Sequence, residues 1–300
     1  MEDQIMKKIY LLTLAALAIF GCNKIETPEA ADGIMGFNIE YPATKATETA
    51  FETGDKIGVY IAAYDGAKPL ALQLGGNYKN NNPVTYDGAK WTADPVIYWD
   101  EAIAKYDVYA YYPFTEPSSV DEMPFSVAID QRKAETDKSL SAYESSDFLY
   151  ATAKGVTSAD NDGNVDLLFK HKMSKFTVKL TKGSEYEGDL PATATVYIHS
   201  TVTDALIDLS TGDVIKNPYA TAKTIIAKQI DESTHTAIIV PQMLTNKKPL
   251  VEIIFKDVSY MVESKFNFKT GTHHILNITI NNNPDKVKIE IGGEIENDWL

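Results

Sequence analysis

Histidines and carboxylates are the residues of this chain that could bind a metal or transfer protons. The 300 residues include five histidines and 42 aspartates and glutamates. His273 and His274 are adjacent, and adjacent side chains of a strand point to opposite faces, so the two cannot hold one metal ion there. His171, His199 and His235 have no second histidine or carboxylate at helical spacing on a segment that is predicted to be helical. We therefore interpret all five histidines as structural and predict no metal site.

An acidic run at residues 160–166 offers several oxygens of the kind that calcium prefers. Its spacing does not match the EF-hand loop. With Gly163 at the glycine position of that loop, Phe169 stands where the bidentate glutamate is required. An acidic turn between two strands is the simpler interpretation, and we adopt it.

The sequence shows no motif of nucleophilic or nucleotide-dependent catalysis. It has no Gly-x-Ser-x-Gly elbow, no phosphate-binding glycine loop and no dinucleotide fingerprint. A glycosidase needs only two carboxylates at the right separation, but such a pair is not visible in a sequence. Trp91, Trp99 and the tyrosine-rich run 106–112 could stack on sugars, although aromatic residues in strands more often pack in the core. We predict no catalytic residue and no cofactor.

The single cysteine, Cys22, follows an apolar run of twelve residues, 9–20, which is preceded by Lys7 and Lys8. Such a run suits the core of an export signal and is too short to span a bilayer. Gly21 and Cys22 close the segment, which resembles a bacterial lipoprotein signal, although the usual leucine three residues before the cysteine is missing. The resemblance implies cleavage between Gly21 and Cys22 and acylation of the cysteine, and the acyl chains would anchor the protein in the membrane. An ordinary secretory signal with an incidental cysteine is the alternative.

Composition excludes several classes of protein. The net charge is −14, and Arg132 is the single arginine. A chain so acidic repels phosphate backbones, which argues against nucleic-acid binding. One cysteine rules out an intramolecular disulfide and a multi-cysteine metal site. A hydrophobic share of 44% and a charged share of 23% are typical of a globular protein.

Short β-rich runs alternate with turn signals from Lys56 onward, which is typical of sandwiches and barrels. A turn-rich stretch at residues 158–164 suggests a boundary between two halves, each long enough to bury a core. We predict an all-β chain with four parts. They are a signal peptide at 1–21, a lipidated tether with a cleavable first strand at 22–50, an N-terminal β-sandwich domain at 51–163 and a C-terminal β-sandwich domain at 164–300.

Several phrases, taken together and in order, resemble the fimbrillin family of Bacteroidales lipoproteins, the Mfa-like subunits of their surface pili. The phrases are FETGDKIGVY at 51–60, PVIYW at 95–99, YDVYAYYP at 106–113, SDFLYA at 146–151, LFKHKMSK at 168–175, GTHHILNI at 271–278 and the late Trp299.

The resemblance implies a fold of two transthyretin-like β-sandwich domains in tandem, in which His171 and Asp147 are structural. It also implies a function in assembly. Subunits of the family are exported as lipoproteins to the outer membrane, and a surface protease removes an N-terminal segment with the first strand. The groove that remains accepts a strand from a neighbouring subunit, which is a form of strand addition. The partners implied are other fimbrial subunits, the processing protease, the outer membrane and a ligand on a host or bacterial surface.

In this chain the removed segment would run from Cys22 to about Lys45, with Met35, Phe37 and Ile39 filling the groove beforehand. The cut would fall between Lys45 and Ala46, where family members often carry arginine in place of the lysine. The candidate for a donated strand is the alternating run that contains Val287, Ile289 and Ile291. The same run could instead be the last strand of its own domain, and both interpretations stay open.

Three functions from different classes therefore compete. The first is a non-enzymatic structural or adhesive subunit of a surface fimbria, assembled by protease-triggered strand exchange. The second is an outer-membrane lipoprotein that does not polymerise and binds glycans through an aromatic surface. The third, an enzyme such as a glycosidase, has the least support in the sequence.

Overall fold

The computed structural model describes residues 33–42, 50–136, 139–190, 192–284 and 288–295, with side chains described up to residue 284. In this part of the chain the regular structure is strand, apart from two short 3₁₀ turns, η1 (Glu144–Ser146) and η2 (Asp160–Gly163). None of its helical turns is long and apolar enough to cross a membrane. The prediction of an all-β fold is confirmed.

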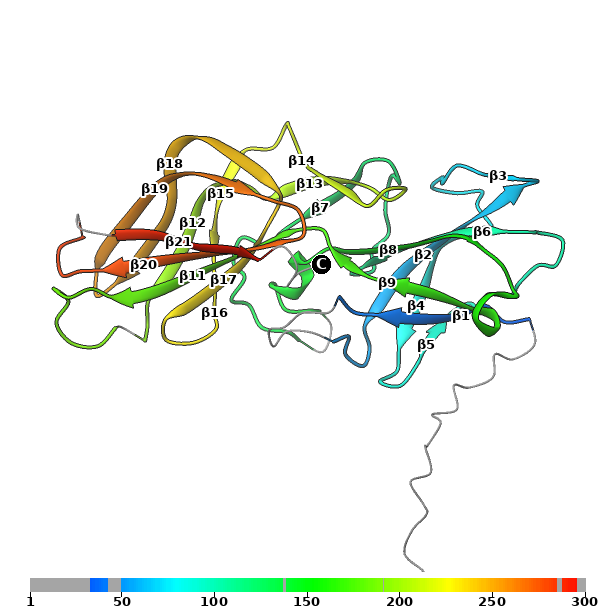
Figure 1. The fold of residues 1–300 in the computed structure, drawn as a ribbon, viewed down its shortest axis with the longest axis horizontal. Coiled ribbons are helices and arrows are strands. Elements are labelled where there is room, and N and C mark those ends of the chain that lie inside the picture. Colours follow the sequence, from blue (N-terminus) through cyan, green and yellow to red (C-terminus); the bar gives the residue numbers. More distant parts are fainter. Residues whose placement is uncertain (1–32, 43–49, 137–138, 191, 285–287, 296–300) are drawn as a thin grey trace, which may run out of the picture.

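A seven-stranded sheet dominates the first half of the chain, at the right of Figure 1. Its strands, in spatial order, are β10 (Lys170–His171), β8 (Leu149–Val156), β6 (Tyr106–Tyr112), β2 (Lys56–Asp65), β4 (Lys79–Tyr86) and β5 (Trp91–Ala93), with β3 (Lys68–Pro69) paired to β2.

Both faces of this sheet are buried. Every residue of β6 is buried, and so are six consecutive residues of β2. Val59 and Val108 face one hydrophobic cluster, whereas Tyr60 and Tyr111 face another on the opposite side. Burial on both faces explains why these runs are mostly apolar in the sequence, apart from Asp107, and do not alternate.

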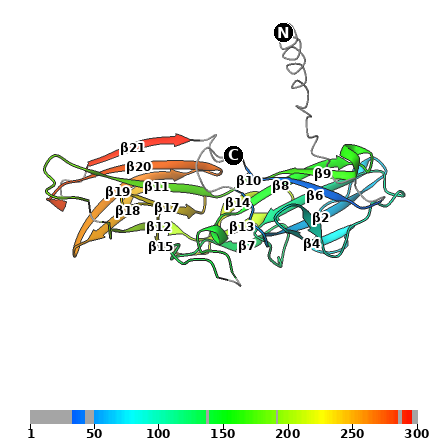
Figure 2. The same ribbon diagram turned by 90° about the horizontal axis from the view of Figure 1, so that it is seen from below.

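Two small sheets cover the two faces (Figure 2). One consists of β1 (Gly36–Glu40) and β9 (Asn164–Leu168), which pair in parallel. The other consists of β7 (Met123–Ser126), β13 (Asp204–Asp208) and β14 (Asp213–Lys216). The strands that cover the central sheet therefore come from four separate stretches of the chain, namely β1, β7, β9 and the β13–β14 hairpin.

The second half of the chain, at the left of Figure 1, forms two sheets that pack face to face. The five-stranded sheet is β16 (Lys228–Gln229), β17 (Thr234–Ile239), β11 (Ser174–Lys182), β20 (Thr272–Ile280) and β21 (Lys288–Ile295). The four-stranded sheet is β15 (Ala222–Ile226), β12 (Thr195–Val202), β18 (Gln242–Phe255) and β19 (Val258–Phe268). Phe176 of β11 contacts Phe266 and Phe268 of β19 across the interface, with ring centroids 5.1 and 5.3 Å apart.

The two halves are joined by more than the chain that connects them. The Tyr150 hydroxyl of β8 donates a hydrogen bond to the Leu209 carbonyl, 2.9 Å away, in the loop between β13 and β14. Gly212 of that loop has φ +73°, and an added Cβ would overlap the Tyr150 ring. The Gln131 amide bonds both the N–H and the carbonyl of Ile238 in β17, at 2.8 and 2.7 Å. These contacts hold the β13–β14 hairpin and the segment before η1 against the opposite half.

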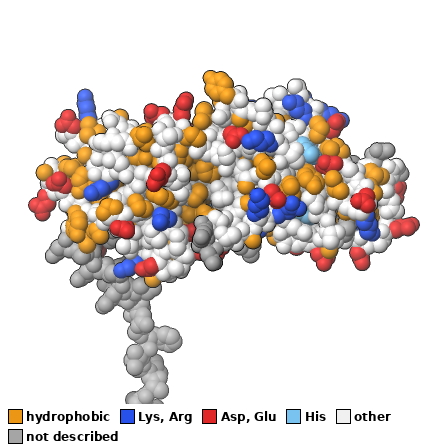
Figure 3. Space-filling model, turned by 180° about the vertical axis from the view of Figure 1, so that it is seen from behind, with side chains coloured by type: hydrophobic (Ala, Val, Ile, Leu, Met, Phe, Trp, Pro, Cys, Tyr) orange, Lys and Arg blue, Asp and Glu red, His pale blue; other side chains and the backbone are white. Residues whose placement is uncertain are grey.

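Figure 3 shows the back of the molecule, where hydrophobic side chains are scattered among lysines and acids. The domain boundary that we predict at 163/164 falls between η2 and β9. After it, β9 and β10 still pack on the first half, and β11 is the first strand of the second-half sheets. The number of domains stays a prediction.

Two histidines flank β11 in the five-stranded sheet, and one of them is buried and the other partly buried. His235 of β17 is 1% exposed and lies 3.0 Å from the Ala194 carbonyl through Nε2. His273 of β20 lies 2.8 Å from the Thr177 hydroxyl through Nε2. Burial, together with the positive charges of Lys175 and Lys179, lowers the pKa of His273 to about 4. In the folded chain this imidazole is therefore neutral at pH 7.

We predict that His273 makes the fold sensitive to acid. Its pKa falls from 6.5 in the unfolded chain to about 4 in the fold, so the unfolded chain binds more protons between these pH values. Stability is unaffected by this group above about pH 6.5 and decreases as the pH falls towards 4. A His273→Gln variant should lose less thermal stability than the wild type between pH 7 and pH 4.5, measured by circular dichroism. Equal losses in the two proteins would contradict this assignment.

Candidate functional site

Strand β1 covers one face of the central sheet but belongs to a different, two-stranded sheet. β1 pairs with β9 in parallel, from Gly36 opposite Asn164 to Glu40 opposite Leu168. Together they form a separate two-stranded sheet (Figures 1 and 2). The alternation of apolar and other residues from Met35 to Ile39 favours a half-buried strand, as the sequence predicts.

The inward side of β1 is apolar along its whole length. Met35 is 1% and Phe37 is 8% exposed, and both belong to the cluster that includes Val59. Ile39 and Tyr41 are partly buried against the same cluster. We predict from the sequence that Met35, Phe37 and Ile39 fill the groove under β1. Met35 and Phe37 are buried there, and Ile39 is partly buried. The prediction missed Tyr41, which continues the same two-residue period and could have been found from it.

Hydrogen bonds hold the strand at both ends. Before β1, the Met35 N–H donates to the Ile97 carbonyl at 2.9 Å, and the Trp99 N–H donates to the Gly33 carbonyl at 2.7 Å. After β1, the Phe169 N–H donates to the Glu40 carbonyl at 3.0 Å. These bonds are backbone contacts that another strand of suitable shape could also make.

A side-chain contact fixes the register on the exposed side. The Asn38 amide donates to Asp166 Oδ1, 2.8 Å away on β9. The acidic run 160–166 is therefore a structural turn. Within it Asn161 and Asp162 have positive φ angles, and Asp160 accepts hydrogen bonds from Thr157.

Aromatic rings surround the point where the chain leaves β1 and the point where it returns to the central sheet. Tyr41 and Phe51 lie with ring centroids 5.0 Å apart, and Tyr41 also contacts the His171 ring at 5.7 Å. Phe51 contacts three further rings at 4.9 to 5.6 Å, namely Trp91, Tyr112 and Phe169. His171 Nδ1 lies 2.7 Å from Asp147 Oδ2, which orients the imidazole. Tyr41 and Phe51, which stand on either side of residues 43–49 in the sequence, thus belong to one aromatic cluster.

The predicted processing and lipidation residues lie outside the described residues. They are Gly21, Cys22, Lys45 and Ala46, and Val287 of the predicted donor run also lies there. Ile289 and Ile291 belong to β21, which pairs antiparallel with β20 at the edge of the five-stranded sheet. Ile289 lies opposite Ile278, and Ile291 lies opposite Leu276.

The histidines do not converge on one site. His199 lies 3.0 Å from Glu252 Oε2 and 2.9 Å from the Thr224 hydroxyl on the four-stranded sheet. His274 packs against Phe266 and Phe268 inside the second half. Among the described residues, no group of three or more histidine, cysteine or acidic side chains is placed to hold a metal ion.

The aromatic residues considered for sugar stacking are largely used in packing. All residues of the run 106–112 are buried. The Trp99 indole donates to the Gly163 carbonyl at 3.0 Å, and Trp91 stacks on Tyr86 with ring centroids 5.1 Å apart.

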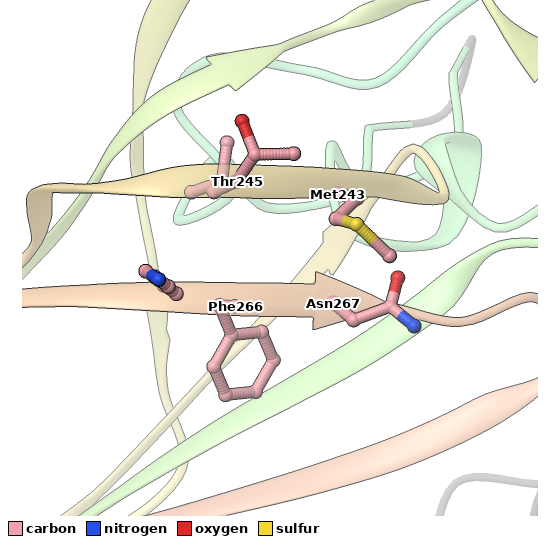
Figure 4. A pocket seen from close by; sticks show the side chains of 6 residues that line it. Met243, Thr245, Phe266 and Asn267 are labelled. Carbon is pink, nitrogen blue, oxygen red and sulfur yellow. The ribbon is translucent and has the colours of Figure 1, made fainter.

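A shallow hollow of about 310 Å³ lies between β18 and β19, where the pairing shifts register after Leu244 (Figure 4). Its lining is mostly apolar, and Lys265 is its one ionisable residue. The residues that line it are Met243, Leu244, Thr245, Lys265, Phe266 and Asn267. This lining offers no pair of groups for acid–base chemistry.

Comparison with known proteins places the chain in a family. The sequence model of the family described as "Fimbrillin-like" matches residues 44–299. The chain belongs to the fimbrillin-like family. The match begins between β1 and β2, so β1 lies outside the matched stretch. Fimbrillin-like proteins are structural and adhesive proteins, which agrees with the prediction that the chain is not an enzyme.

One curated relative and several solved structures are similar to this fimbrillin-like chain. A Bacteroides ovatus protein named "Putative fimbrium tip subunit Fim1C" is 27% identical over 201 residues, which cover 58% of this chain and 36% of that protein. The chain thus spans about a third of the length of that relative. Two crystal structures, each of a "putative cell adhesion protein", share the fold. The one from Bacteroides uniformis has a TM-score of 0.66 at 20% identity and covers 90% of this chain and 100% of that one. The one from Bacteroides ovatus has a TM-score of 0.64 at 20% identity and covers 89% and 98%.

We predict that β1 contributes strongly to stability as long as it is attached. Phe37→Ala should lower the free energy of unfolding by about 3 kcal/mol, because it empties a buried position against the central sheet. Glu40→Ala on the same strand, at an exposed side chain, should change it by less than about 0.5 kcal/mol. Urea unfolding followed by tryptophan fluorescence measures both. A loss at Phe37 no larger than that at Glu40 would show that β1 is not a structural part of the fold.

Proposed function

We propose that this chain is a structural subunit of a cell-surface fimbria, exported as a lipoprotein and assembled by β-strand exchange. In this proposal Cys22 carries the lipid, a surface protease cuts between Lys45 and Ala46, and β1 then leaves the fold. A strand from a neighbouring subunit takes its place. The observation that carries the proposal is that β1 lies over one face of the central sheet and pairs only with β9, in a two-stranded sheet of its own.

The physical driving force is the apolar surface beneath β1. Loss of the strand would uncover the cluster that includes Val59 and Val108 and would leave β9 without its partner. Burying one large apolar side chain is worth about 1.5–3 kcal/mol, and β1 places several on this face. An uncovered apolar face with a free strand edge is unfavourable in water, so it favours the capture of another strand.

The location of the cut supports the same proposal. Residues 43–49 connect β1 to the sheet, and Tyr41 and Phe51, which flank this segment in the sequence, are in contact. Cleavage in this segment separates β1 from β2 and leaves both of these strands intact. The family match from residue 44 onward is consistent with a mature subunit that begins after β1.

The sequence of the export segment supports a lipid anchor, because the only thiol of the chain stands directly after Gly21. Because the aromatic run 106–112 is buried, we do not propose that this run forms a glycan-binding platform.

The first test is the N-terminus of the protein taken from its native cell surface, determined by mass spectrometry. We expect assembled subunits to begin near Ala46, because a subunit that has exchanged its first strand must have lost it. Polymeric protein that still begins at Cys22 would contradict assembly through the β1 groove.

A second test concerns the anchor. Cys22→Ala should move the uncleaved precursor from the membrane fraction to the soluble periplasmic fraction, because the acyl acceptor is gone. Asn23→Ala serves as the matched control and should leave the precursor in the membrane. Cell fractionation with immunoblotting measures both. A precursor with Cys22→Ala that stays membrane-bound would rule out acylation as the anchor.

A further inference from the structure

We propose that the groove under β1 selects its occupant and rejects the C-terminal run of this same chain. The strand that it accepts comes from a different protein and carries four alternating apolar side chains, of which the fourth is aromatic. This inference rests on the proposed strand exchange and adds the chemistry of the partner.

The groove has four inward positions, because every second residue from Met35 to Tyr41 contacts the cluster beneath. The fourth position differs from the other three. Tyr41 sits there between the rings of Phe51 and His171, at 5.0 and 5.7 Å and nearly perpendicular to both. Edge-to-face packing of this kind rewards a flat ring and leaves a void around a smaller side chain.

A second constraint lies at Gly36, which faces Asn164 of β9. A Cβ at this position would collide with the side-chain oxygen of Asn164. That side chain donates its amide to the Asn161 carbonyl at 3.2 Å, so moving it aside would break a hydrogen bond within the turn. The groove therefore favours glycine directly after the first apolar residue.

A third constraint is the charge of Asp166, which accepts the amide of Asn38 at 2.8 Å. A strand with an amide here reproduces the hydrogen bond. A strand with a carboxylate here would place two negative charges side by side, which is destabilising.

The C-terminal run of the chain violates these constraints. It has three consecutive alternating apolar residues, Val287, Ile289 and Ile291, bounded by Asp285 on one side and Gly293 on the other. Any four alternating positions that include these three must therefore contain an acid or a glycine, whichever way the strand runs.

In the parallel register that places Val287 at the position of Met35, the outward positions fail as well. Lys288 then takes the place of Gly36, and Glu290 takes the place of Asn38 opposite Asp166. Gly293 takes the place of Tyr41 and leaves the aromatic position empty. The run instead forms β21, paired with β20 in its own sheet.

The partner is thus a strand of seven consecutive positions, of which the first, third and fifth are apolar, the first two of these being large, and the seventh is aromatic. The second position is glycine, the fourth is asparagine or glutamine, and the sixth can be any residue. A subunit with such a groove does not assemble with copies of itself through this run. It joins a chain of different sequence.

The test uses the full chain with residues 43–49 replaced by the site of a sequence-specific protease. After cleavage, β1 is held only by non-covalent contacts, and fluorescent peptides are added in excess. The four peptides are residues 34–42, the same peptide with Tyr41→Gly, residues 285–295, and the latter with Lys288→Gly, Glu290→Asn and Gly293→Tyr. Native mass spectrometry and fluorescence anisotropy measure the fraction of protein that carries each peptide.

We expect the 34–42 peptide to enter the groove. Its Tyr41→Gly form and the unmodified 285–295 peptide should bind at least about tenfold more weakly, because each leaves the aromatic position empty. The triple-substituted 285–295 peptide should recover most of that loss, which a non-specific apolar effect would not produce.

Two results would overturn the inference, and they are distinguishable. If the unmodified 285–295 peptide enters as readily as the 34–42 peptide, the groove accepts strands but does not discriminate between their sequences. The selectivity proposed here is then wrong, whereas the proposed strand exchange is unaffected. If no peptide enters after cleavage, the groove does not exchange strands and both proposals fail.

Discussion

The constraint on which the rest of the structure depends is that the seven-stranded sheet is apolar on both faces. A sheet with Val59 and Val108 on one side and Tyr60 and Tyr111 on the other cannot leave either side in water. The chain covers the two sides in different ways. The β13–β14 hairpin is continuous with the chain at both ends and is fixed by Tyr150 and Gly212. β1 is continuous with the rest of the described fold only through residues 43–49. A single cut within residues 43–49 would separate β1 from the rest of the described chain, whereas the hairpin would stay joined to it at both ends.

Local patterns in the sequence predict much of the second half and little of how the first half is closed. The alternation of Phe176, Val178 and Leu180 predicts a strand with one buried face, and these three residues are 0, 1 and 3% exposed. The same period predicts β1. The parallel pairing of β1 with β9 joins residues 128 positions apart, and no local pattern encodes such a contact. The continuous run 106–112 hides which of its side chains face which cover, because both faces are buried.

Polar residues that could carry chemistry in another setting are used here to hold the backbone. Asp55 accepts hydrogen bonds from the Glu52 N–H at 2.7 Å and from the Tyr112 hydroxyl at 3.0 Å, and burial raises its pKa. Asp107, 3% exposed, accepts the Gly155 N–H at 2.9 Å and the Tyr64 hydroxyl at 3.1 Å. Buried acids with donors at these distances stabilise turns and bulges, which is what buried polar groups in most folds do. Residue types alone do not distinguish this use from catalysis, whereas the bonding partners do.

The direction of β1 has a mechanical consequence. β1 and β9 run along the long axis of the molecule (Figure 1). A strand that lies in this groove and is pulled along that axis is loaded in shear. The backbone pairing of residues 36–40 and the contacts of the inward side chains then resist the force together. A strand that lay across the axis would instead lose its residue pairs one after another under the same force. Because rupture under load is governed by the rate of the rate-limiting opening step, the axial arrangement would make a short strand a durable joint in the proposed assembly.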